Sequence, residues 1–303
     1  MNSKHIMAMA GAVALCGSVY GERNWTTGDG ITRDETPIVS TEVSLAFDSK
    51  FISYGLVDNN DPILTPSASM RFFDWVTLSV ASIFDISQYG RDAGYGNRAW
   101  RSQELDPGVA LGHAFGPDEV AWLPTTVEFE FGYMYESHPP VVDDDTHFVM
   151  FSVGLPDLCF EPAFSYERDL DRDHGTYLNL EIGHTFTLIG GSEEGDGDIL
   201  DFRLSAAQGW GDGKRIRAYL PDIRNVDSNG EYGVLDRAGL MDTCIKGELA
   251  WRIANGVTLG GSVACYDYLF DSTNREASRS YEATGRWTDS WNFVASLSLT
   301  VAF

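Results

Sequence analysis

Apolar and polar residues alternate with a period of two along most of the chain. In TTVEFEFGYMYES at 125–137, one face carries Val127, Phe129, Phe131, Tyr133 and Tyr135. The other face carries Glu128, Glu130, Gly132, Met134 and Glu136. Successive side chains of a β-strand point to opposite faces, whereas an amphipathic helix repeats every 3.6 residues. No convincing helical repeat stands out, so the pattern predicts an all-β protein.

Twelve segments carry this alternation, near 41–52, 64–73, 76–86, 102–115, 125–137, 146–155, 158–168, 176–188, 199–210, 240–253, 257–268 and 291–303. Their length is close to the roughly 9–11 residues that a tilted strand needs to cross a bilayer, whereas soluble strands average about 5–6. Tight turns at Asp74, Pro156 and Asn255 alternate with longer loops such as 86–101, 211–239 and 269–290. An even strand number with short turns on one side is the plan of an outer-membrane barrel. We therefore expect a closed antiparallel transmembrane β-barrel of about 12 strands over 41–303, with both termini periplasmic.

The N-terminus has the pattern of an export signal. Lys4 and His5 precede an apolar run from Ile6 to about Val19, and small residues lie just before Glu22. The run of about fourteen residues is shorter than the ~17–25 needed to span a membrane as a helix. We expect residues 1–21 to be a cleaved signal peptide and 22–40 to be a periplasmic segment.

Charge limits the partners of this chain. Asp and Glu number 45 against 21 Lys and Arg, giving a formal net charge of -24. Nucleic-acid binding requires basic groups opposite the phosphates, so we expect no nucleic-acid partner. Cys159, Cys244 and Cys265 show no CxxC spacing, and we expect small half-buried fillers rather than a metal or redox site.

The last strand, FVASLSLTVAF, ends on Phe303 and resembles the terminal strand of bacterial outer-membrane proteins, which the barrel-assembly machinery recognises. DSKFISYGLVDNNDPILTPSASM at 48–70 is similar to the first hairpin of the TorF-type porins, in which Ser-Asp-Tyr-x-Phe-Arg-Gly precedes a Pro-containing strand. QELDPGVALGHAF at 103–115 and the segment 151–186 resemble that family in order and spacing. The chain departs from it at Ser53 and Tyr54, which replace an aromatic-Arg pair before Gly55. The resemblance implies an outer-membrane β-barrel protein of a Gram-negative bacterium, in contact with membrane lipid and lipopolysaccharide.

The charged face of the strands is expected to line the lumen. A basic side chain facing lipid at mid-membrane costs about 2–4 kcal/mol, and an acidic one somewhat less. The predicted pore-lining acids are Asp48, Glu104, Asp106, Glu128, Glu130, Glu136, Glu161, Glu167, Glu181, Asp201, Asp242 and Glu248, and the bases are Lys50, Arg71, Arg203, Lys246 and Arg252. A barrel of this size would leave a narrow pore for small hydrophilic solutes, with weak cation preference. The alternative is that these charges pair across the lumen and plug it.

The longest loop, 211–239, concentrates Lys214, Arg215, Arg217 and Arg224 in an otherwise acidic chain. One hypothesis is that this loop folds inward against Glu128 and Glu130 and forms a constriction. The alternative is an extracellular loop with basic residues on its surface.

An outer-membrane enzyme is one alternative to a channel. An outer-membrane lipid hydrolase would need a Ser, His and Asn or Asp set on the outer wall, for which His113, His138, His147, His174 and His184 are the available histidines. None of them lies in a nucleophile motif. DLDRDHG at 169–175 spaces Asp like a calcium loop, but its Gly is one place late and Leu180 holds the required acidic position. A closed structural or adhesion barrel is a third class. We expect a channel that is not an enzyme, with no catalytic residue, cofactor or metal site.

Overall fold

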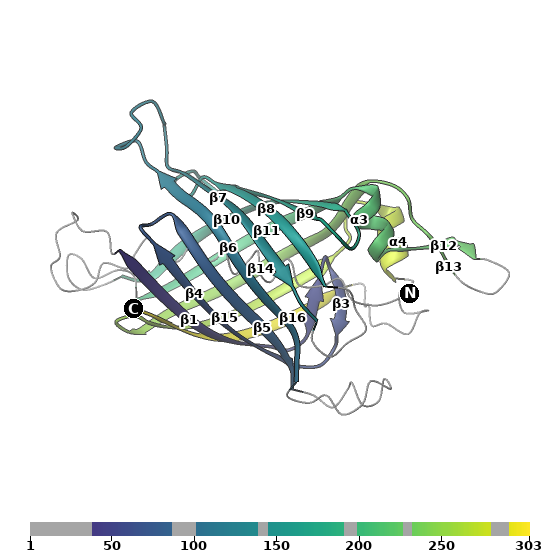
Figure 1. The fold of residues 1–303 in the computed structure, drawn as a ribbon, viewed down its shortest axis with the longest axis horizontal. Helices are drawn as coiled ribbons and strands as arrows, with labels where there is room; N and C mark the ends of the chain where they lie inside the picture. The colour runs from purple at the N-terminus through teal and green to yellow at the C-terminus, as the bar shows by residue number, and fades with distance from the viewer. Residues whose placement is uncertain (1–37, 87–100, 139–144, 191–198, 227–231, 280–290) are drawn as a thin grey trace.

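The chain forms a closed antiparallel barrel, shown in Figure 1. This is a computed structural model, which describes residues 38–86, 101–138, 145–190, 199–226, 232–279 and 291–303. The predicted signal peptide and most of the predicted periplasmic segment lie outside these residues. Within them, twelve strands form the wall: β1 (Val39–Asp48), β4 (Ile63–Phe72), β5 (Val76–Asp85), β6 (Arg101–Phe115), β7 (Val127–Glu136), β8 (Thr146–Gly154), β9 (Ala163–Asp169), β10 (Thr176–Ile189), β11 (Leu200–Gly211), β14 (Gly239–Ala254), β15 (Val257–Asp267) and β16 (Asn292–Ala302).

Closure is made by the first and last strands of the wall. β1 pairs with β16 from Glu42 opposite Ala302 to Asp48 opposite Ser296. The register extends to Phe303, whose N–H donates to the Thr41 carbonyl at 2.9 Å. A barrel spans a bilayer only when no strand edge is left with unpaired N–H and C=O groups. The prediction of a twelve-stranded closed antiparallel barrel is confirmed.

Strand boundaries differ from the predicted ones at two places. β1 ends at Asp48 rather than near 52, and β9 begins at Ala163 rather than near 158. Positive φ angles at Phe160 (66°) and Glu161 (37°) interrupt the extended backbone before β9. The connection near Pro156 is consequently longer than the tight turn expected from its sequence. The turn after β14 is tight as predicted, with Gly256 at φ 67°.

The outside of the barrel is an apolar belt. Its exposed side chains include Val43, Leu45, Phe47, Leu78, Val80, Val109, Leu111, Phe131, Leu180, Ile182, Phe186, Leu204, Ile245, Leu249, Val263, Leu297 and Leu299. Soluble monomers rarely expose contiguous apolar patches beyond a few hundred Å². This continuous belt on a closed barrel is the architecture of an outer-membrane β-barrel. Among the described residues, no helix has the length and apolar character needed to cross a membrane.

Short elements gather at one end of the barrel, opposite the C-terminus (Figure 1). They are β2 (Phe51–Ser53), β3 (Leu56–Asn59), α3 (Gly213–Tyr219), β12 (Pro221–Val226), β13 (Tyr232–Val234) and α4 (Ser272–Arg279). We call this end, at which β5, β7, β9, β11 and β15 finish, the mouth. The opposite end is the turn end. The side chain of Asp212 caps α3 by accepting hydrogen bonds from the N–H groups of Lys214 and Arg215. The two helices were not expected from the sequence, because each has only seven or eight residues.

Candidate functional site

Most of the charged residues predicted to line the lumen lie on the inner face of the wall or reach it. Glu128 and Glu130 alternate with outward Phe131 and are 4% and 7% exposed, while Phe131 is 50% exposed. The same alternation and registers place on the inner face Asp48, Arg71, Glu104, Asp106, Glu181, Asp201, Arg203, Asp242, Lys246 and Glu248. Glu161 lies in the β8–β9 connection and reaches this face through its ion pair with Arg203.

Basic side chains on the inner face form ion pairs with neighbouring acidic side chains. Arg203 pairs with Glu161 and, at 3.0 Å, with Glu181. Lys246 pairs with Glu248 two residues along the same strand. These pairs neutralise part of the wall. Among the described residues, acids still outnumber bases on the inner face.

A hairpin made by β2 and β3 crosses the mouth. Tyr54 and Gly55 form its tip with φ angles of 46° and 77°, the two positive values of a type I′ turn. Tyr54 Oη donates to Glu167 Oε1 on β9 at 2.6 Å, and β9 stands six places from β1 in the ring of twelve strands. The hairpin leaves the wall at β1, so this hydrogen bond reaches the opposite side of the barrel. Tyr268 Oη donates to the Tyr54 carbonyl and Asn292 Nδ2 to the Gly55 carbonyl, which secures the near side.

Apolar side chains fill the space around this hairpin. Buried Leu56 from β3 packs with Ile216 and Leu220 at α3 and with Met241 on β14. Ala277 of α4 completes the cluster. The mouth therefore has a small hydrophobic core of its own. We call the four elements β2, β3, α3 and α4 the plug.

Arg215 joins the plug to the barrel wall. Its side chain is 0% exposed, with Nη2 3.0 Å from Glu167 Oε1 and Nε 3.3 Å from Asp173 Oδ2. Nη1 donates to Tyr54 Oη at 2.9 Å and to Tyr219 Oη at 3.3 Å. Burial raises the pKa of Asp173 above its ordinary value, and the charge of Arg215 opposes this rise.

The predicted contact of this loop with Glu128 and Glu130 is not formed by Arg215. Arg215 does fold inward, but its acidic partners are Glu167 and Asp173. Glu130 lies too far from the mouth for this contact. It is six residues along β7 from Glu136 at the mouth, which corresponds to about 20 Å.

The other basic residues of the loop behave differently from Arg215. Lys214 is exposed, and Arg217 is exposed and pairs with Asp236. The side chain of Arg224 lies outside the described part of the chain. The surface alternative therefore describes Lys214 and Arg217, while Arg215 enters the mouth.

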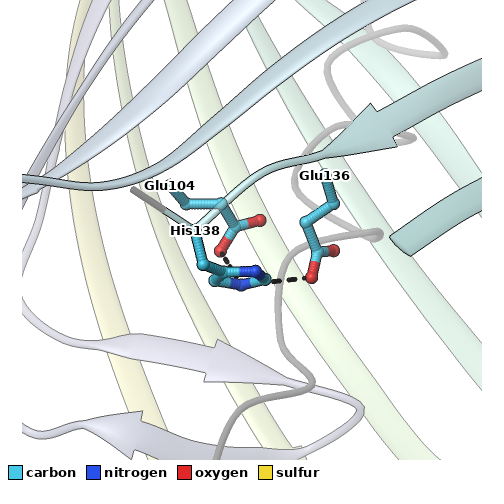
Figure 2. Close-up of side chains that lie close together, drawn as sticks. All are labelled: Glu104, Glu136 and His138. Atoms are coloured by element: carbon cyan, nitrogen blue, oxygen red, sulfur yellow. Dashed lines mark ion pairs between the residues drawn. The ribbon is translucent and has the colours of Figure 1, made fainter. Parts of the chain in front are cut away.

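A second cluster lies at the mouth ends of β6 and β7 (Figure 2). His138 Nε2 is 3.2 Å from Glu136 Oε1 and 3.5 Å from Glu104 Oε2. Arg172, from the β9–β10 connection, lies 3.2 Å from both Glu136 Oε1 and His138 Nδ1. From its sequence context, His138 is only one of the histidines available to a lipid hydrolase. This grouping was missed because its members come from separate segments.

Three other histidines lie on the outer face. His113 stacks on Trp75 with ring centroids 4.3 Å apart, His147 contacts Tyr133, and His184 lies 3.6 Å from Glu161. Cys244 is paired with Tyr266 across the β14–β15 ladder and Cys265 with Ile245, so the two thiols point to opposite faces of the wall. Within the described residues, Cys159, Cys244 and Cys265 are free thiols.

Comparisons with known proteins give distant structural matches. No family model matches the chain, and no curated protein matches it. The solved KdgM porin is 10% identical, with 87% of this chain and 99% of that one covered and a TM-score of 0.44. The COG4313 outer membrane channel from Pseudomonas putida F1 is 9% identical, with 89% and 97% covered and a TM-score of 0.46. Salmonella typhi OmpF in complex with daunomycin is 8% identical, with 88% and 97% covered and a TM-score of 0.35. Similarity at this level does not extend to function, so the proposals below rest on the geometry of this chain.

Proposed function

We propose that this protein is a bacterial outer-membrane channel for passive diffusion of small hydrophilic solutes, with a weak preference for cations. The observation that carries the proposal is the division of one closed wall into an apolar exterior and an acidic interior. Such a wall satisfies the bilayer outside while its inner carboxylates raise the local concentration of cations. Paired bases such as Arg203 moderate this preference without reversing it.

A closed structural barrel is the second candidate, and one observation favours it. The hydrogen bond from Tyr54 to Glu167 extends from the β1 side of the mouth to β9, and the plug packs around it. A channel therefore requires either a passage beside the plug or movement of the plug. A structural barrel requires neither.

Recording from the purified, refolded chain in a planar bilayer tests both candidates. A channel gives discrete conductance steps, and a KCl gradient gives a reversal potential of cation-selective sign. Replacing Glu128 and Glu130 together by Gln should move that potential toward zero. Glu119, an exposed carboxylate in the β6–β7 connection, provides the matched control as Glu119→Gln. Absence of any conductance step from well-folded protein would support the structural barrel.

Further parts of the proposal follow from the barrel and the sequence. We propose that residues 1–21 are removed as a signal peptide, that both termini are periplasmic, and that membrane lipid and lipopolysaccharide surround the belt. Phe303 would present the last strand to the barrel-assembly machinery. The similarity of 48–70 to TorF-type porins supports assignment to that family. We propose no covalent chemistry, so an ester-hydrolysis assay should give no turnover.

A further inference from the structure

The mouth ends of β6 and β7 place a histidine among three carboxylates. Leu105 and Ser137 are paired by two backbone hydrogen bonds of 2.9 and 3.0 Å. Continuing this antiparallel register places Glu104 opposite His138, and Asp106 opposite Glu136. Alternation then turns all four side chains to the inner face.

The spacing of three of these groups fits a metal ion. One ligand atom from each of Glu104, Glu136 and His138 lies within 4.8 Å of the other two. The two edges that include His138 Nε2 measure 3.2 and 3.5 Å. Zinc bonded at about 2.0–2.2 Å in a tetrahedron separates neighbouring ligands by roughly 3.4 Å. Figure 2 shows both carboxylates directed at the imidazole ring.

Buried carboxylate oxygens without N–H or hydroxyl donors point independently to a cation site at this place. Asp106 is 2% exposed, and its carboxylate oxygens receive no N–H or hydroxyl hydrogen bond from the described residues; its carboxyl group lies instead against that of Glu104. Asp106 interacts electrostatically with both Glu104 and Glu136. Glu136 is 1% exposed, and its Oε2 also lacks such a donor. Buried carboxylates are costly unless a charge or a metal compensates them.

Within the part of the chain that the structure describes, the guanidinium of Arg172 contacts this cluster. Its Nη1 lies 3.2 Å from Glu136 Oε1. Its Nη2 lies 3.2 Å from His138 Nδ1, and because a guanidinium only donates, that nitrogen is the acceptor. Nε2 therefore carries the proton. Binding a metal through Nε2 moves this proton to Nδ1 and displaces Arg172, while the imidazole stays neutral.

We propose that Glu104, Glu136 and His138 bind a divalent transition-metal ion of the zinc class at the barrel mouth, in competition with Arg172, and that Asp106 balances its charge. A mixed set of one imidazole nitrogen and carboxylate oxygens suits zinc or manganese better than the all-oxygen sites of calcium and magnesium. This site is independent of whether the barrel conducts.

Calorimetric titration of the chelator-treated, refolded chain with ZnCl2 tests the site. One saturable site per chain is expected, which excess CaCl2 does not displace. His138→Gln should weaken zinc binding at least about tenfold, whereas Arg172→Gln should strengthen it. His184→Gln is the matched control, because His184 also lies beside a carboxylate but is exposed on the outer face.

Two results would overturn the site. One is the absence of saturable zinc binding by the wild-type chain. The other is wild-type affinity in both His138→Gln and the isosteric variant Glu136→Gln. Heat-modified gel mobility checks that each variant forms a barrel, and Glu104→Gln replaces any variant that does not.

Discussion

Replacing Arg215 by methionine should release the plug from the barrel wall. Methionine keeps an apolar stem beside Tyr219 but removes the guanidinium that lies 3.0 Å from Glu167 and 3.3 Å from Asp173. Breaking a buried ion pair by removing one partner costs about 3–5 kcal/mol, because the other charge stays buried without compensation. Since the plug has a small core of its own, this loss should fall on the plug rather than on the twelve-stranded wall.

Hydrogen exchange measures this effect locally. In the wild-type chain, the amides of β2 and β3 should be protected, and in Arg215→Met they should exchange faster by a factor of 100 or more, since about 1.4 kcal/mol corresponds to tenfold. If the plug limits conduction, open probability in a planar bilayer should rise in the same variant. Adding Glu167→Gln should restore part of the protection, because no uncompensated acid then remains at that position.

Lys214→Met provides the control, since Lys214 is the adjacent base on α3 but is exposed. It should leave the exchange of β2 and β3 unchanged. Equal exchange in Arg215→Met and Lys214→Met would refute the view that Arg215 holds the hairpin across the mouth.

Three further outcomes are expected. Burial raises the folded-state pKa of Asp173 above its ordinary 3.8. The contribution of Asp173 to stability is therefore fully present below pH 3.8 and is lost as pH rises through the raised pKa. In thermal denaturation, Asp173→Asn should reduce the gain in stability of the mouth that the wild-type chain shows on acidification. Gly55→Ala should loosen the hairpin by about 1 kcal/mol or more, because φ is 77° and a Cβ would lie 2.5 Å from the Asp242 Cβ; proteolysis of 51–59 would reveal this, and unchanged resistance would contradict it. Deleting Phe303 should slow assembly in cells while leaving refolding in detergent intact, and a comparison of the two yields checks this.

The wall of this protein was predictable from local pattern. Period-two alternation over about ten residues requires one apolar and one polar face. Twelve such segments with short and long connections correspond to the twelve strands of the barrel wall. The same alternation predicts that Glu128 and Asp201 point into the barrel, because successive residues of a strand point to opposite faces.

The alternation of apolar and polar residues does not predict the contacts inside the mouth. Tyr54 and Glu167 are 113 residues apart, and Tyr54 and Arg215 are 161 apart. The helices that carry part of the plug are too short for a helical repeat to be recognised. The sequence does contain one local signal for the turn at Tyr54–Gly55, a glycine between two short apolar runs. The strand that this turn contacts, however, depends on closure of the barrel.

The amino-acid sequence alone therefore determined that this chain forms a barrel and which side of each strand faces lipid, because hydrophobic alternation acts between adjacent residues. The folded chain decided which inner charges meet. Closing twelve strands into a ring brings β1 opposite β9, and only that geometry allows Tyr54, Glu167 and Arg215 to form one buried cluster.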